Sequence, residues 1–130
     1  MNHMEQVLAE KRAAGRKVFV GYFPLGDPLM GDPVVRVGEF IADGVDVLEL
    51  GIPYVNPSLD GAVVSDSMGR ALEAGDLLSA MDIIADLRRA YPEACLQAMT
   101  YYETVEDMGV DGFCARVSEL GADGVLAPNV

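Results

Sequence analysis

The sequence predicts an α/β protein in which the strands pair in parallel and a short helix precedes the first strand. Segments rich in β-branched and aromatic residues alternate with segments of helical spacing, and the connections are long enough for helical crossovers. GVDVLELG at 44–51 also resembles GADGVLAP at 121–128, which indicates repeated β/α units. An open doubly wound sheet and a (β/α)₈ barrel both fit this pattern. The lack of G-x-G-x-x-G and of G-x-x-x-x-G-K-[ST] disfavours a nucleotide-binding open sheet.

The first elements are a helix and a strand. Residues 4–14 have apolar side chains at helical spacing and are followed by Gly15, which suits the left-handed position after a helix. Residues 17–23, KVFVGYF, are β-branched and aromatic, and the prolines and glycine that begin at Pro24 predict a loop after them. The chain is therefore expected to begin with a leading helix and to continue into the sheet.

The remaining elements repeat this alternation. Asp32 is a natural N-cap, Pro33 fits the first helical position and Gly44 ends the apolar stripe, so a helix is expected between them. By the same reasoning, further strands are predicted at 45–51, 95–102 and 122–127, and further helices at 65–74, 76–90 and 110–120.

Composition restricts the possible partners and the location. A chain of 130 residues with 51% hydrophobic content is expected to form a single domain, residues 1–130. The formal charge of −12 and the scattered basic residues argue against a nucleic-acid partner. Neither a signal-type leader nor an apolar stretch approaching the roughly 20 residues that span a bilayer is present, so the sequence predicts a cytoplasmic protein without a membrane partner.

No metal site is expected. Cys95 and Cys114 stand apart, without a C-x-x-C pair or a nearby histidine, which favours two buried or half-buried thiols. His3 is the only histidine and lies near a terminus that is expected to fray.

Glu49 is the most informative single residue. In VDVLELG, the strand period of two places it with Val47 and Gly51 on one face, so a carboxylate projects near the C-terminal end of an apolar strand. Active sites of (β/α)₈ barrels are built at that end of the strands. A solvated glutamate at an edge or in a loop is the alternative.

Asp60 lies in the long connection between the second strand and its helix, residues 52–64. Connections of this length are uncommon unless they serve a site or a partner. Its neighbour Gly61 leaves an ordinary turn as the alternative. If the connection does serve a site, it is expected to be mobile and to place Asp60 on the same side of the sheet as Glu49.

Four segments resemble successive landmarks of the tryptophan synthase α subunit family and occur in the same order. They are YFPLGDP at 22–28, LELGIPYVNPSLDG at 48–61, MTYYETV at 99–105 and GVDGFCARVSELGADGVLAPN at 109–129. The second is the most specific, because family members carry E-L-G-x-P followed by D-P-x-x-D-G, in which the glutamate and the second aspartate are the catalytic pair. Those positions are Glu49 and Asp60 here.

The resemblance implies a barrel of TIM type and a lyase of tryptophan biosynthesis. The implied reaction is retro-aldol cleavage of indole-3-glycerol phosphate, a small phosphate ester, to indole and glyceraldehyde 3-phosphate. Glu49 is expected to carry out the proton transfers, and Asp60 is expected to stabilise the positive charge that develops at the indole N–H. No cofactor is required by this scheme. The resemblance also implies a β-subunit partner.

Further substrate contacts follow less directly. Tyr22 corresponds to an aromatic residue that contacts indole in the family. Alternating positions of the third and fourth strands are expected to point into the barrel, with ordinary core packing as the alternative; these are Met99, Tyr101, Leu126 and Pro128.

The sequence departs from the family at several loop positions. Asn56 replaces an aspartate and Ala62 a proline in the loop that faces the β subunit, which weakens the expectation of that partner. Glu103-Thr104 replaces an asparagine-proline pair, and Asn129 replaces an acidic residue.

Length is the larger departure. A (β/α)₈ barrel needs eight strands and roughly 250 residues, whereas four strands are predicted here. The phosphate-binding loops after strands seven and eight therefore have no counterpart among the predicted elements. The resemblance predicts the N-terminal half of a barrel, with open sheet edges that favour self-association. A noncatalytic assembly module and another phosphate-handling barrel enzyme remain alternatives.

Overall fold

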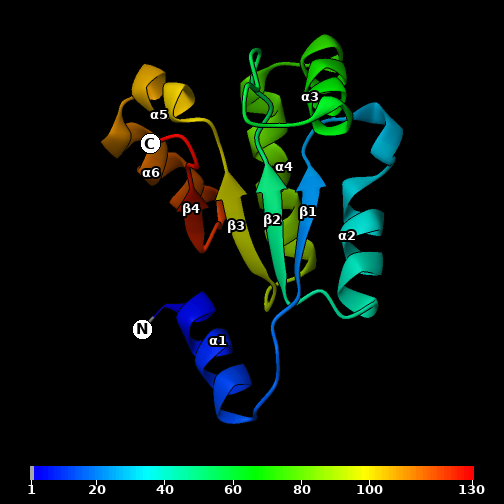
Figure 1. The fold of residues 1–130 in the computed structure, drawn as a ribbon, viewed down its shortest axis with the longest axis vertical. Helices are drawn as coiled ribbons and strands as arrows, with labels where there is room; N and C mark the ends of the chain where they lie inside the picture. Colours follow the sequence, from blue (N-terminus) through cyan, green and yellow to red (C-terminus); the bar gives the residue numbers. More distant parts are fainter. Residues whose placement is uncertain (1) are drawn as a thin grey trace.

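The computed structural model describes residues 2–130 as a parallel sheet with helices packed on one face (Figure 1). The strands are β1 (Val20–Pro24), β2 (Val47–Gly51), β3 (Cys95–Met99) and β4 (Gly124–Leu126). The helices are α1 (His3–Ala13), α2 (Pro33–Ala42), α3 (Ala62–Ala74), α4 (Leu77–Ala90), α5 (Tyr102–Met108) and α6 (Val110–Leu120), with a 3₁₀ turn, η1 (Pro28–Met30).

The sheet has the predicted architecture of a partial (β/α) barrel. Its strand order is β1-β2-β3-β4, and every neighbouring pair is parallel, which confirms the expected pairing. Each strand is followed by a helix before the next strand begins. Within the described chain, β1 and β4 each pair on one side only, so the sheet has two free edges.

The two faces of the sheet differ in what covers them. Successive side chains of a strand point to opposite faces of the sheet. Those on the face away from Glu49 pack against helices α2, α4 and α6 and form the core. The strands contribute Phe23, Leu48, Leu50, Leu96 and Ala98 to this core, and the helices contribute Val37, Ile84, Leu87, Phe113 and Val117. The opposite face, which carries Glu49, corresponds to the interior of a barrel.

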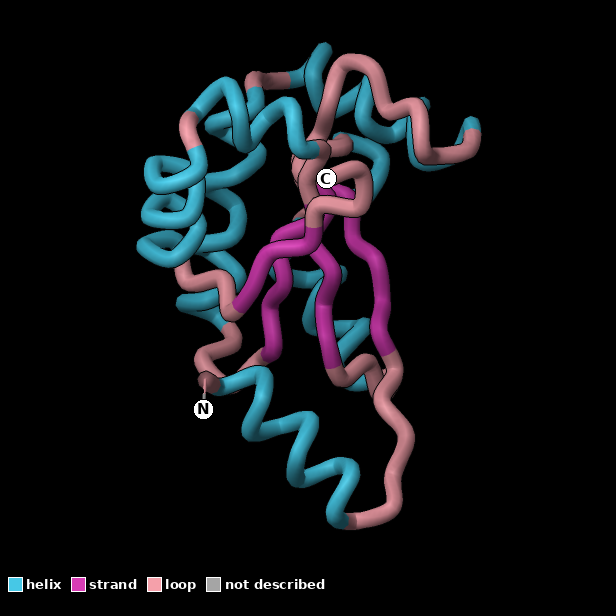
Figure 2. Tube along the Cα trace, turned by 60° about the vertical axis from the view of Figure 1, so that its left-hand side comes forward, coloured by secondary structure: helices cyan, strands magenta, loops and turns pink. Residues whose placement is uncertain are grey.

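Helix α1 lies at the end of the sheet where the strands begin (Figures 1 and 2). It contributes no buried residue, so polar contacts contribute to its placement. Lys11 Nζ lies 2.7 Å from the Asp46 carboxylate, which also accepts a 2.9 Å hydrogen bond from the amide of Phe19. The end of the sheet where the strands finish is left to the β/α loops.

Several predicted boundaries were wrong. β1 begins at Val20 and includes Pro24, which is tolerated because β1 is an edge strand and needs no donor on its free side. β3 ends at Met99 instead of residue 102, because the chain turns into α5, a helix that the aromatic run concealed. β4 covers only Gly124–Leu126 instead of 122–127, because its ladder with β3 has only those three pairs.

A buried ion pair ties the loop after β1 to α3. The side chain of Asp27 is 1% exposed and accepts hydrogen bonds from Arg70 Nε at 3.0 Å and Arg70 Nη2 at 2.8 Å. It also accepts from Ser67 Oγ at 2.7 Å and from the amide of Leu29 at 3.0 Å. The Arg70 hydrogen bonds are the largest cause that holds the pKa of Asp27 well below its usual range.

Gly26 allows this loop to approach the helices closely. Its φ of 88° lies in the left-handed region, and a Cβ there would be 3.2 Å from the Cβ of Ala80.

Among residues 2–130, none of the helices has both the length and the apolar character needed to cross a bilayer.

Candidate active site

Glu49 lies in the middle of β2, on the barrel-interior face, instead of at the last strand position. Glu49 is in register with Tyr22 on β1 and with Gln97 on β3, so three polar side chains form one row across the sheet. Glu49 is half-buried, whereas its neighbours Leu48 and Leu50 are fully buried in the core on the other face. The strand therefore presents the carboxylate to the open interior, as the alternation predicts.

Tyr22 extends from this row toward the C-terminal end of the sheet. A Cβ added to Gly51 would overlap the Tyr22 phenol, so the glycine allows the ring to lie directly over β2. The Tyr22 hydroxyl is buried and has no hydrogen-bond partner among the described residues. An unpaired buried hydroxyl is costly, and it is a group that a bound ligand can satisfy.

Asp60 is held in place by Tyr101. The Tyr101 hydroxyl donates a 2.6 Å hydrogen bond to Asp60 Oδ2 and accepts a 2.9 Å hydrogen bond from the amide of Leu59. Tyr101 is buried and stacks on Tyr54, with ring centroids 5.1 Å apart. Burial and, next, the hydrogen bond to Asp60 raise the pKa of the Tyr101 phenol above its ordinary value, so it stays protonated and donates.

The charges of Glu49 and Asp60 both act on the Tyr22 phenol. Burial is the largest cause that raises the pKa of Tyr22, and the charges of Asp60 and Glu49 are the next two. Both negative charges disfavour ionisation of this phenol because both lie near it. Glu49 and Asp60 therefore both lie near Tyr22.

The other predicted contacts divide into two groups. Met99 on β3 is in register with Gly51 on β2 and with Leu126 on β4, so both predicted contacts lie on the face that carries Glu49. Tyr101 and Pro128 lie beyond the ends of β3 and β4, so their predicted strand positions were wrong. Tyr101 instead precedes α5, and Pro128 lies in an exposed turn, where its missing N–H breaks no ladder.

Sequence analysis missed Gln97. Its period-two relation to Cys95 and Met99 indicated the interior face, but an uncharged side chain gave no reason to single it out. The register beside Glu49 makes it a candidate to hydrogen-bond a substrate.

Two departures from the family pattern contact each other. Asn129 Nδ2 donates a 2.8 Å hydrogen bond to Glu103 Oε2, and Asn129 Oδ1 accepts one of 2.8 Å from the first amide of α5, that of Tyr102. The pair therefore links the end of β4 to the start of α5. Ala62, another departure, is the first residue of α3, a position that also suits proline, and so both residues permit the helix to begin there.

Replacing Tyr101 with Phe should loosen the loop from Ile52 to Gly61. The variant keeps the ring that stacks on Tyr54 but removes both hydrogen bonds to the loop, at a cost of about 1–3 kcal/mol. Faster hydrogen exchange at the Leu59 amide would show this. Tyr102→Phe is the matched control, because the Tyr102 hydroxyl makes no hydrogen bond to the described residues. Unchanged exchange in Tyr101→Phe would mean that the loop is held by other contacts.

Comparisons with known proteins identify the family and the fold. The profile of the family described as "Tryptophan synthase alpha chain" matches residues 8–130. The chain is 35% identical to the tryptophan synthase alpha chain of Thermobifida fusca (strain YX), covering 100% of this chain and 48% of that protein. It is 36% identical to that of Laribacter hongkongensis (strain HLHK9), covering 97% of this chain and 48% of that protein.

A solved structure gives the same correspondence. Tryptophan synthase subunit alpha from Legionella pneumophila str. Paris superposes with a TM-score of 0.90 at 30% identity, covering 98% of this chain and 49% of that one. The chain spans about half the length of the curated relatives it matches. A family profile that covers nearly the whole chain, together with this fold, leads to one conclusion. The chain belongs to the tryptophan synthase alpha chain family.

Proposed function

We propose that residues 1–130 form the N-terminal half of a (β/α)₈ barrel that, when completed, cleaves indole-3-glycerol phosphate to indole and glyceraldehyde 3-phosphate in tryptophan biosynthesis. The observation that carries this proposal is the position of Glu49. Its carboxylate lies on the interior face of β2, in register with Tyr22, whose phenol is also influenced by the charge of Asp60. Two carboxylates around an aromatic, partly apolar surface suit acid–base chemistry on an indole ring.

In the proposed reaction, one proton moves from a hydroxyl to a carbon. Glu49 donates a proton to the indole carbon that bears the side chain, and the ring becomes an electron sink. The side-chain hydroxyl next to that carbon then loses its proton to the Glu49 carboxylate, the carbon–carbon bond breaks, and the hydroxyl-bearing carbon becomes the aldehyde of glyceraldehyde 3-phosphate. The bonding electrons remain on the indole, and Glu49 is restored to its protonated form.

Asp60 would act on the charge that this protonation creates. Its carboxylate is oriented by Tyr101, so it does not have to reorganise as positive charge develops at the indole nitrogen. Tyr22, Met99 and Leu126 would contact the ring from the same face of the sheet. Proton transfer alone completes the scheme, which therefore requires no cofactor.

A β-subunit partner is part of this proposal. The loop that would face it carries Asn56, which is exposed, and ends at Ala62, the first residue of α3. These two positions lack the aspartate and the proline expected from the family. We therefore expect them to weaken binding of the β subunit more than they affect the proton transfers.

A second candidate function is a noncatalytic half-barrel that assembles through its sheet edges. Apolar side chains at both edges favour it. Phe19, just before β1, and Val20, its first residue, are 62% and 51% exposed, and Val125 and Leu126 on β4 are 37% and 38% exposed. Unpaired strand edges with apolar neighbours promote association with another sheet.

Indole release distinguishes the two candidates. The assay would compare the 130-residue chain with a barrel completed by the C-terminal half of a family member, each with and without a β subunit. Release by the completed barrel supports the lyase. A completed, folded barrel that releases no indole, combined with a stable dimer of the short chain, would favour the assembly module.

A further inference from the structure

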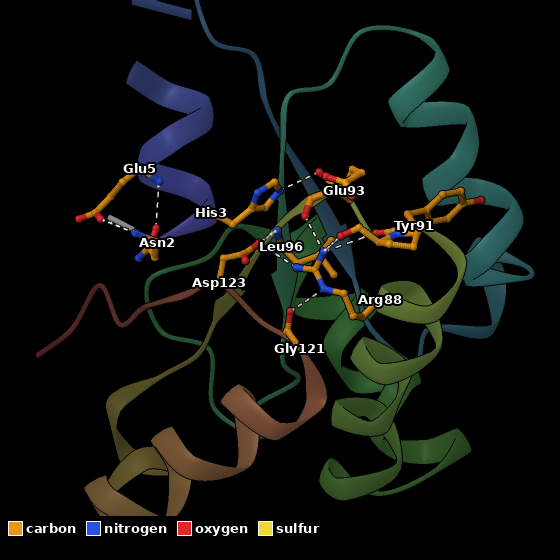
Figure 3. Close-up of polar contacts among 11 residues, drawn as sticks. Asn2, His3, Glu5, Arg88, Tyr91, Glu93, Leu96, Gly121 and Asp123 are labelled. Carbon is orange, nitrogen blue, oxygen red and sulfur yellow. Dashed lines mark hydrogen bonds and ion pairs between the residues drawn. The ribbon is translucent and has the colours of Figure 1, made fainter. Parts of the chain in front are cut away.

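A group of potential metal ligands lies at the end of the sheet opposite Glu49. His3 of α1, Cys95 at the start of β3 and Asp123 just before β4 each place one ligand atom within 4.8 Å of the other two. Three separate elements meet here, although the residues are far apart in the sequence. Figure 3 shows His3 and Asp123 beside the Arg88 network at the start of β3.

The hydrogen bond of His3 leaves one ring nitrogen available. Its Nε2 lies 2.8 Å from the backbone carbonyl oxygen of Glu93 (Figure 3). Because a carbonyl oxygen only accepts, Nε2 carries the proton, and the neutral ring then has its lone pair on Nδ1. A ring N–H donated to a backbone carbonyl is the usual way in which a metal-ligating histidine is oriented.

Asp123 is held by contacts to one of its oxygens. Its Oδ2 accepts 2.8 Å hydrogen bonds from Arg88 Nη2 and from the amide of Leu96 (Figure 3). Its Oδ1 accepts no hydrogen bond from residues 2–130. The carboxylate is therefore fixed in orientation and keeps one oxygen for a ligand. The Arg88 guanidinium occupies the Oδ2 side, so a cation would approach Oδ1.

Cys95 supplies a softer ligand and borders a cavity. Burial is the main cause that raises the pKa of its thiol, and the Asp123 charge adds to it. Zinc binds cysteine as the thiolate, so binding would release the thiol proton. A cavity of about 580 Å³ between α1 and the start of the strands is lined by Cys95 and Glu93 together with Lys11 and Asp46.

We propose that His3, Cys95 and Asp123 bind a zinc ion that fastens α1 to the start of the sheet. Imidazole nitrogen, thiolate sulfur and carboxylate oxygen together suit zinc, with water as the fourth ligand. Ligand atoms around tetrahedral zinc lie about 3.3–3.8 Å apart, so side-chain movements of about 1 Å close the site. The ion would join His3 near the start of the chain to Asp123 near its end, and would add to the Lys11–Asp46 ion pair in holding α1, which has no buried residue.

Cobalt binding tests the ligand set directly. Co²⁺ added to the reduced, chelator-treated 130-residue chain should produce the ultraviolet charge-transfer band of a thiolate ligand, and Zn²⁺ should displace it. Cys95→Ser should abolish the band, and His3→Gln should weaken Zn²⁺ binding by at least about tenfold. His3→Gln changes a partly exposed position in the first turn of α1, so its folding should not be affected.

Cys114→Ser is the matched control, because Cys114 is the other free thiol and is exposed on α6. It should retain the band and the affinity. At the same Zn²⁺ concentration, the metal should also raise the melting temperature of the chelator-treated chain by more than that of His3→Gln. A band that survives Cys95→Ser, a band lost only in Cys114→Ser, or equal Zn²⁺ affinity in His3→Gln would overturn the proposal. Lyase activity is not used as a readout, so this test is independent of the proposed function.

Discussion

Replacing Glu49 with Gln in a completed barrel should lower the rate of indole release by about 100-fold or more. The amide has nearly the same size, so the row of Tyr22, residue 49 and Gln97 across the sheet should keep its shape. It can neither donate a proton to the indole carbon nor take one from the hydroxyl. The loss should appear in kcat, because the proton transfers belong to the transition state and not to substrate binding.

The matched control for this variant is Glu39→Gln on α2. Glu39 is also a glutamate within a regular element, and its side chain is 53% exposed. It lies outside the site and forms a surface ion pair with Arg36, 2.9 Å away. Its replacement should leave indole release unchanged. Normal turnover by Glu49→Gln, with Glu39→Gln also normal, would show that the chemistry resides elsewhere.

The 130-residue chain alone should show little or no indole release in the same assay. Among the described residues, its interior face has neither opposing strands nor the loops after the seventh and eighth strands that bind phosphate in such barrels. Remote binding energy that would orient the substrate is therefore lacking, and orientation accounts for several kcal/mol of barrier lowering. Robust turnover by the short chain would contradict both the proposed mechanism and this account of the half-barrel.

Replacing Asp27 with Asn should lower the free energy of unfolding by about 2–3 kcal/mol. The variant keeps the shape of the side chain but removes the charge that accepts hydrogen bonds from Arg70, and it leaves the loop after β1 less firmly tied to α3. Urea unfolding at neutral pH would measure the difference. Asp86→Asn is the control, because its pair with Arg89 is an exposed i,i+3 contact on α4, for which at most about 1 kcal/mol is expected.

The effect of Asp27→Asn should depend on pH in a defined direction. The pKa of Asp27 is lower in the folded chain than its ordinary value near 4, so the stabilisation is complete above about pH 4 and is lost as the pH falls below it. The wild-type chain and the variant should therefore converge in stability on acidification. A difference that stays constant down to about pH 2 would indicate that the charge of Asp27 is not its source.

Local patterns were sufficient for much of the fold and part of the site. Helix α6 occupies 110–120 as predicted, because Gly109 and Gly121, both with positive φ, lie at its two ends and its apolar stripe repeats at helical spacing. The period of two placed Glu49 on the face opposite Leu48 and Leu50, which are buried in the core. These features depend on residues within one turn or one strand of each other, which the sequence displays directly.

Other features depended on contacts between distant parts of the chain. The Tyr101 hydroxyl can bond to Asp60 only because the parallel strands β2 and β3 finish at the same end of the sheet. The aromatic run around Tyr101 had instead suggested a longer strand. His3, Cys95 and Asp123 lie in three unrelated sequence contexts and come together only when α1 packs beneath β3. Side-chain periodicity reports which face a residue occupies. The partner it meets there is set by strand register and helix packing, because these bring together groups whose separation along the chain carries no local signal.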